Sequence, residues 1–301
     1  MPSLQSDDSK LPKPEPSKQG NLIIIGGGED KKFDKKILTK FVDISGGDKA
    51  DIVVITAASS VQEEVWEIYK EVFTDLGVKT CSKIALYTRE DANNSEIAQQ
   101  VLEADGIFMT GGDQKKLMAL IGGTAIDTAA HKAFLEHAAC VAGTSAGASA
   151  MSGHMLAEST EEKMPVKGTV HLGAGLGFLQ RVIIDQHFSE RQRLGRLLAV
   201  VAQNPYLLGI GIDEDTALVV ARGSWFEVIG NGAVTLVDGR EMISNFSDIH
   251  EEERLELINM KLHLFPAGSR YQYEHCLSDA SKLSPVLQEI ISIIISRETS
   301  S

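Results

Sequence analysis

The architecture of this chain follows from Val141-Ala142-Gly143-Thr144-Ser145-Ala146-Gly147-Ala148-Ser149-Ala150. An apolar run leads into a tight turn, and small residues of helical character follow it, so the stretch predicts a strand, a turn and the start of a helix. Ser145 lies in the turn between Gly143 and Gly147, which is the G-x-S-x-G pattern of a nucleophile elbow. The glycines let the strand and the helix approach closely while the serine hydroxyl stays clear of the backbone. The pattern predicts a reactive serine at a strand end.

Two kinds of segment alternate before this stretch. Short apolar runs predict strands at 21–25, 51–57, 83–87 and 106–110, and a 3.6-residue apolar period predicts helices at 32–42, 61–76, 95–104, 115–120 and 125–137. Strands that alternate with helices form βαβ crossovers, which build a parallel sheet with helices on both faces. We therefore expect an α/β protein, a three-layer sandwich with a mostly parallel central sheet.

The pattern changes after residue 150. Residues 154–180 show little periodicity and are expected to form a long irregular loop. A strand, a helix and a strand are then expected at 181–185, 190–203 and 207–212. Short runs separated by glycine-containing turns predict antiparallel hairpins in the C-terminal third, at 217–221, 225–229 and 234–237. A last helix is expected at 284–295.

Composition indicates a single domain behind a short tail. Residues 1–20 contain four prolines and several charged residues, so we expect a disordered tail, followed by one domain over residues 21–301. No apolar run reaches the roughly 18 residues of a membrane span, and the first residues lack the apolar segment of a signal peptide. These features predict a cytoplasmic protein with no membrane partner.

Charge, cysteine content and glycine spacing argue against several kinds of site. A net charge of −13 disfavours nucleic-acid binding, because phosphate neutralisation requires a basic surface. The three cysteines have no C-x-x-C spacing, so neither a disulfide framework nor a zinc site is indicated. Gly26-Gly27-Gly28 follows the first strand, but Lys31 stands where a dinucleotide fingerprint needs its third glycine. We expect no metal and no cofactor.

A base and an acid for Ser145 are expected at other strand ends, because ligands bind at the carboxyl edge of a parallel sheet. His187 follows the strand at 181–185 and is the histidine best placed to take the serine proton. Glu214 follows the strand at 207–212 and is the preferred acid behind that histidine. The alternatives for this acid are Asp213, Asp185 and Glu158.

The chain order Ser145, His187, Glu214 differs from that of an α/β-hydrolase esterase, in which the acid precedes the histidine. Arginines close to His187 supply a further signal, because a planar guanidinium is suited to bidentate recognition of carboxylates. These arginines are Arg191, Arg193 and Arg196. They favour a substrate that carries carboxylates.

Four spaced motifs together resemble the peptidase E-like family of serine peptidases, and within it the cyanophycinases, over residues 21–298. The motifs are Thr110-Gly111-Gly112-Asp113-Gln114, Gly143 to Met151, Asp185-Gln186-His187-Phe188 with the arginines after it, and Gly211-Ile212-Asp213-Glu214. The resemblance implies a fold related to class I glutamine amidotransferases, with serine as nucleophile, and cleavage next to aspartate. Cyanophycinases release β-Asp-Arg dipeptides from cyanophycin, multi-L-arginyl-poly-L-aspartate, which has a poly-aspartate backbone with an arginine on each side-chain carboxyl.

The resemblance also implies roles for individual residues. Ser145 would attack a backbone carbonyl, with His187 as general base and then general acid and Glu214 behind it. The oxyanion hole is expected at the backbone N–H groups of Ala146 and Gly27. The implied substrate contacts are Gln114, Arg191, Arg193 and Arg196 for aspartyl and carboxyl groups, Asp185 for a guanidinium, and Gln186 beside them.

Other functions stay open at this point. An aspartyl dipeptidase acting on short Asp-containing peptides is the alternative within the same class, and a serine esterase or a non-catalytic binding protein are alternatives from other classes. The expected partner is therefore cyanophycin or an Asp-containing peptide. The resemblance implies a homodimer.

Overall fold

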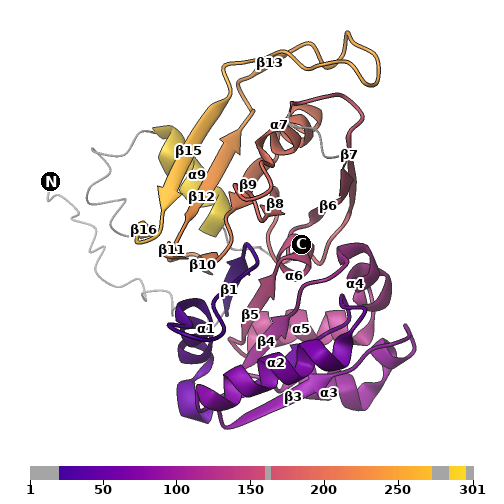
Figure 1. Cartoon of the computed structure of the whole chain (residues 1–301), viewed down its shortest axis with the longest axis vertical. Helices are drawn as coiled ribbons and strands as arrows, with labels where there is room; N and C mark the ends of the chain where they lie inside the picture. Colours follow the sequence, from indigo (N-terminus) through magenta and orange to yellow (C-terminus); the bar gives the residue numbers. More distant parts are fainter. Residues whose placement is uncertain (1–19, 160–163, 273–284, 296–301) are drawn as a thin grey trace, which may run out of the picture.

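The computed structural model describes residues 20–159, 164–272 and 285–295 of the 301-residue chain. The tail expected at 1–20 lies outside the described residues, apart from Gly20. Two sheets dominate the fold, with the parallel strands of the N-terminal half in the lower part of Figure 1 and the second sheet above them.

The first sheet has eight strands in the order β16-β11-β10-β1-β5-β4-β2-β3, and the five from β1 to β3 in this order run parallel. The parallel strands are β1 (Asn21–Ile25), β5 (Cys140–Thr144), β4 (Gly106–Met109), β2 (Asp51–Ile55) and β3 (Thr80–Ile84). The antiparallel strands are β10 (Thr216–Ala221), β11 (Trp225–Gly230) and β16 (Arg270–Gln272). This sheet confirms the predicted α/β class, with a mostly parallel central sheet extended by antiparallel strands.

Helices cover both faces of the first sheet. One face is covered by α1 (Lys36–Ser45) and α2 (Gln62–Asp75), and the other by α3 (Ser95–Leu102), α4 (Gln114–Ile121), α5 (Ala125–Glu136) and the short α6 (Ala146–Ala150). On the α1 and α2 face, the fully buried Phe108 ring lies 5.4 Å from the ring centroids of Phe41 and Phe73 and 4.8 Å from that of Tyr69. These aromatic contacts join α1 and α2 to β4.

The second sheet has four strands in the order β15-β12-β9-β8. β8 (Val182–Gln186) and β9 (Leu208–Ile212) run parallel, whereas β12 (Ala233–Asp238) and β15 (Lys261–Pro266) are antiparallel to their neighbours. α7 (Leu194–Gln203) packs on one face, and the other face shares its core with α9 (Pro285–Ile295) and α6. A small antiparallel pair, β13 (Ile243–Ser244) and β14 (Leu257–Ile258), follows β12.

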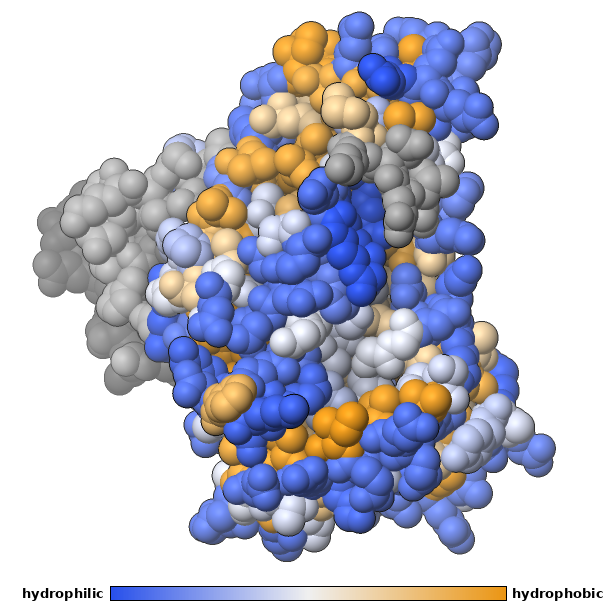
Figure 2. All heavy atoms as spheres, viewed as in Figure 1, coloured by the Kyte–Doolittle hydropathy of each residue, from blue (hydrophilic) through white to orange (hydrophobic). Residues whose placement is uncertain are grey.

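The surface over β12 and β15 is partly apolar, as Figure 2 shows. β15 is an edge strand, and its Leu262 and Leu264 side chains are 54% and 61% exposed. None of the helices in the described ranges is long and apolar enough to cross a membrane.

The structure corrects the loop predicted at 154–180. Residues in this segment form an antiparallel pair of strands, β6 (His154–Ser159) and β7 (Val170–Ala174), with a register shift between Leu156 and Glu158. Met155 and Leu156 are both buried, so the side chains do not alternate strictly between solvent and core. This irregularity explains why a period-2 pattern was not visible in the sequence.

Two predicted helices begin later than expected. The helix predicted from residue 32 begins at Lys36, because the Asp30 carboxylate accepts the backbone N–H groups of residues 32 to 35 and Lys35 has φ 46°. The helix predicted from residue 190 begins at Leu194, because His187 and Gln192 adopt positive φ values of 48° and 52°. The strand predicted at 83–87 lies at Thr80–Ile84.

The aromatic cluster predicts a large stability effect at Phe108. Replacing Phe108 by Ala leaves a cavity between β4, α1 and α2, and we expect the free energy of unfolding to fall by about 3 to 5 kcal/mol. Phe33, which is 87% exposed, is the matched control, and Phe33→Ala should change the value by less than about 0.5 kcal/mol. Equal losses in urea-induced unfolding would contradict this account of the core.

Candidate active site

Ser145 lies in a strained turn between β5 and α6. Its backbone has φ 52° and ψ −110°, a combination that L-residues rarely adopt. A Cβ at Gly143 would come 2.5 Å from the Gly147 carbonyl carbon, and one at Gly147 would come 2.4 Å from the Met109 carbonyl oxygen. Both glycines are therefore required by close backbone packing around the elbow.

Three side chains form a hydrogen-bonded chain at this turn. Ser145 Oγ lies 2.9 Å from His187 Nε2, and His187 Nδ1 lies 2.6 Å from Glu214 Oε1. The His187 side chain is 13% exposed and that of Glu214 is 40% exposed. The geometry suits a serine nucleophile, a histidine base, and a carboxylate that orients the base.

The loop after β1 joins the nucleophile to the base. The Ile25 carbonyl accepts the Ser145 N–H at 3.1 Å, and the Gly26 carbonyl accepts the His187 N–H at 2.7 Å. Gly27 has φ +95°, and a Cβ there would lie 2.3 Å from His187 Cε1. Backbone alone thus occupies the space beside the imidazole, and the loop holds β5 of one sheet and β8 of the other in fixed positions.

The same loop contacts the acid. The Gly27 carbonyl accepts the Asp215 N–H at 2.8 Å, and a Cβ at Gly28 would lie 2.9 Å from Glu214 Oε2. The Glu214 N–H donates to Glu190 Oε2 at 3.1 Å. The turn after β9 is therefore held from two sides, which directs Glu214 at His187.

The alternative acids have other partners. Asp213 accepts the backbone N–H groups of Ser189 at 3.1 Å and Ala233 at 3.0 Å, which is the role of a turn residue. Glu158, on β6, lies 3.4 Å from Lys115 Nζ, and both side chains are largely exposed. The His187 Nδ1 atom is instead hydrogen-bonded to Glu214.

Four of the six residues that were expected to contact substrate form hydrogen bonds with one another. They are Asp185, Gln186, Arg193 and Arg196. Asp185 is fully buried and accepts from Arg196 Nε at 2.7 Å and from a second Arg196 nitrogen. Arg193 donates to Gln186 Oε1 at 2.7 Å and to the Gln186 carbonyl oxygen. This geometry disagrees with Asp185 as the acceptor of a substrate guanidinium, because an internal arginine already occupies its carboxylate.

The other two expected contacts lie at different sides of the site. Gln114 Nε2 donates to the Leu156 carbonyl at 3.0 Å and, more weakly, to the Ala157 carbonyl at 3.4 Å, so it ties the start of α4 to β6. Arg191 follows His187 in the turn before α7, and its side chain is exposed. Of the six, Arg191 is the one with an exposed side chain.

Of the two expected oxyanion donors, Ala146 directly follows Ser145. Ala146 is the first residue of α6, where helix N–H groups lack intrahelical acceptors. Gly27 lies against the His187 ring, where a Cβ would come within 2.3 Å of Cε1. Gly111 was not among the expected donors, yet a Cβ added to it would lie 3.8 Å from Ser145 Oγ. The Gly-Gly pair after β4 was the signal that could have indicated it.

The Asp30 carboxylate accepts hydrogen bonds from the backbone of the residues that follow it in the loop after β1. Hydrogen bonds from backbone N–H groups, that of Lys32 first, lower the pKa of Asp30 to about 2. The Asp30 N–H also donates to Asp215 Oδ1 at 2.9 Å. The loop is thereby tied to the turn that carries Glu214.

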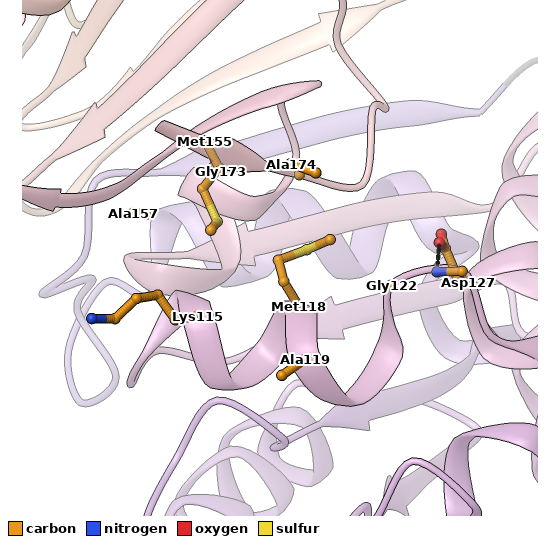
Figure 3. Close-up of a pocket in the computed structure, with 11 residues that line it drawn as sticks. Lys115, Met118, Ala119, Gly122, Asp127, Met155, Ala157, Gly173 and Ala174 are labelled. Carbon is orange, nitrogen blue, oxygen red and sulfur yellow. Dashed lines mark hydrogen bonds between the residues drawn. The ribbon is translucent and has the colours of Figure 1, made fainter. Parts of the chain in front are cut away.

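A cleft of about 480 Å³ separates α4 from the β6 and β7 pair. Figure 3 shows Met118 and Met155 on opposite walls, with Lys115 near one end and Asp127 near the other, where Asp127 accepts the Gly123 N–H at 2.7 Å. No member of the Ser145, His187 and Glu214 set lines it. Within the described ranges, no group of three or more His, Cys, Asp and Glu side chains could hold a metal ion.

Comparisons with known proteins agree with this geometry. The family model described as peptidase family S51 matches residues 22–228. The chain is 35% identical to the cyanophycinase of Trichormus variabilis over 90% of this chain and 91% of that protein, and 36% identical to the cyanophycinase of Geminocystis herdmanii over 84% and 93%. Its fold is similar to the crystal structure of a peptidase from an acI-B1 Actinobacterium, with a TM-score of 0.62, 22% identity and coverage of 84% and 97%. The chain therefore belongs to peptidase family S51.

Proposed function

We propose that this enzyme is a serine exopeptidase that hydrolyses cyanophycin to β-Asp-Arg dipeptides through an acyl-enzyme on Ser145. The observation that carries the proposal is the chain of hydrogen bonds from Ser145 through His187 to Glu214. Relatives at 35% and 36% identity that are named cyanophycinase support the substrate.

The geometry supports a two-step acyl transfer. His187 Nε2 takes the proton from Ser145 as Oγ attacks the carbonyl carbon, and the Nδ1–H remains hydrogen-bonded to Glu214. The tetrahedral intermediate collapses as His187 gives its proton to the leaving amine, which leaves an ester on Ser145. His187 then takes a proton from water as the water attacks the ester carbon, and gives it to Ser145 Oγ as the C–Oγ bond breaks and the new carboxylate leaves.

Backbone N–H groups are proposed to bind the oxyanion of the intermediate. Ala146 is one donor, because its N–H begins α6 directly after the nucleophile. The second donor is expected from Gly27, as the resemblance implies, or from Gly111, which lies beside Ser145. Such donors stabilise charge that develops only in the transition state.

Substrate carboxylates are proposed to bind on the His187 side of the site. Arg191 supports this, because its guanidinium is exposed four residues after the base. Arg193 and Arg196 donate to Gln186 and Asp185, so they are proposed to support this side of the site rather than to bind the carboxylate directly. Gln114 stays a proposed substrate contact through its side-chain oxygen. Gln186 is buried, with Oε1 accepting from Arg193 and Nε2 donating to Ser149 Oγ at 3.4 Å, so its proposed role is to support this side of the site.

We also propose that the enzyme works in the cytoplasm as a homodimer, without nucleic-acid or membrane partners. The net charge of −13 supports the exclusion of nucleic acid. Leu262 and Leu264 on the edge strand β15 offer exposed apolar surface to a second copy. Light scattering that gives 32.6 kDa, the mass of one chain, would contradict the dimer.

Cyanophycin cleavage should depend on the Ser145 hydroxyl. The purified protein, incubated with cyanophycin, should release β-Asp-Arg detectable by mass spectrometry, and Ser145→Ala should lower kcat by roughly 10³-fold or more. Ser45→Ala is the control on a buried serine at the end of α1, which packs against Gly106 at the start of β4, and it should keep activity. Release of dipeptide from short Asp-containing peptides alone would instead favour an aspartyl dipeptidase.

The acid behind His187 can be identified by two neighbouring substitutions. Glu214→Gln removes the charge that holds the Nδ1–H, so kcat should fall by roughly 10² to 10⁴-fold. Asp213→Asn weakens two hydrogen bonds to backbone N–H groups, so it should lower the melting temperature while kcat stays within a few-fold. A larger loss of kcat in Asp213→Asn than in Glu214→Gln would contradict the assignment.

A further inference from the structure

Glu29 is a buried carboxylate that the mechanism above does not use. It follows Gly28 in the loop after β1, and its side chain is 1% exposed. Burial of a carboxylate is costly unless its oxygens are hydrogen-bonded and its charge is paired. The groups that meet these requirements show what Glu29 holds in place.

Three groups surround the Glu29 carboxylate. Thr144 Oγ1 donates to Oε2 at 2.7 Å, Tyr69 Oη donates to Oε1, and Lys31 Nζ lies 2.9 Å from Oε1. Burial, together with the charge of Glu29, raises the pKa of Tyr69 well above its usual range, so the phenol remains a donor. The Lys31 ammonium also lies 5.2 Å from the centre of the Tyr69 ring. The carboxylate is thus paired and satisfied.

One of these donors belongs to the nucleophile elbow. Thr144 is the last residue of β5 and immediately precedes Ser145, whose backbone is strained. The Ser145 N–H is held by the Ile25 carbonyl, and the Thr144 hydroxyl is held by Glu29. Both tethers come from β1 and the loop after it, which also contacts His187 and Glu214.

We propose that Glu29 is a positioning residue for catalysis, and that its hydrogen bond to Thr144 holds the strained elbow so that Ser145 Oγ stays within reach of His187. A strained turn persists only when its surroundings fix it. Release of the Thr144 hydroxyl lets the strand end relax, and a displacement of well under 1 Å at the nucleophile lowers the rate of attack without changing the residues that bind substrate. This inference rests on the proposed serine peptidase function.

Three substitutions test the proposal. Thr144→Val removes the donor at nearly constant shape, and kcat on cyanophycin should fall about tenfold while KM stays within about twofold. Thr144→Ser keeps the hydroxyl and should restore kcat to within about threefold of the wild type. Thr56→Val is the matched control, because Thr56 is a fully buried threonine after β2 whose hydroxyl donates to Gln62 Oε1 at 3.0 Å, away from the triad.

The control separates positioning from a purely structural role. A structural role would lower the melting temperature in Thr144→Val and Thr56→Val alike and leave kcat unchanged in both, whereas the proposal expects kcat to fall in Thr144→Val alone. Wild-type kcat in Thr144→Val, or a loss in Thr144→Ser as large as in Thr144→Val, would overturn it.

A second measurement does not depend on the substrate. Phenylmethylsulfonyl fluoride reacts with activated serines, and the rate of Ser145 modification should fall about tenfold in Thr144→Val and recover in Thr144→Ser. If the wild type fails to cleave cyanophycin but reacts with the reagent, the proposed substrate fails and the role of Glu29 is still decided by these rates. Equal rates in the wild type and Thr144→Val would overturn the inference.

Discussion

His187 can lie against Ser145 because only backbone occupies the space beside its ring. The Gly26 carbonyl accepts the His187 N–H, and the next residue, Gly27, has φ +95° and no room for a Cβ. Ser145 follows a strand of one sheet, whereas His187 and Glu214 follow strands of the other. The loop after β1 therefore contacts strand ends from both sheets. The alignment of Ser145, His187 and Glu214 depends on this loop.

Buried polar contacts also join the strand before His187 to the helix after it. Asp185, at the end of β8, is fully buried and paired with Arg196 of α7. Loss of one partner of a buried pair leaves an uncompensated charge, which typically costs about 3 to 5 kcal/mol. This pair fixes α7 against β8 beside His187, so the arginines after the base have two roles: those inside maintain the scaffold, and the exposed Arg191 faces solvent where a ligand can reach it.

The strands and helices of the first sheet could largely be predicted, because the apolar periodicity shows where each strand ends. The candidate residues could be chosen because ligands bind at the carboxyl ends of parallel strands. Ser145, His187 and Glu214 follow three strands that the sequence indicated. The partners of Asp185 were not predictable, since whether a carboxylate faces a ligand or an internal arginine depends on packing. The pairing of β6 with β7 was not predicted, because a register shift interrupts the alternation of buried and exposed side chains. The burial and the hydrogen bonds of Glu29 were not predicted, because its partners Tyr69 and Thr144 are distant in the sequence.

We propose that the absence of a side chain at Gly27 allows His187 to activate Ser145, and labelling of Ser145 by phenylmethylsulfonyl fluoride tests this most directly. Gly27→Ala and Gly77→Ala impose similar backbone strain, with φ of +95° and +77°, but a Cβ at Gly77 meets nothing within 4 Å. The wild type and Gly77→Ala should be modified at Ser145, and the rate should fall at least about tenfold in Gly27→Ala. Modification of Gly27→Ala at the wild-type rate would contradict the account.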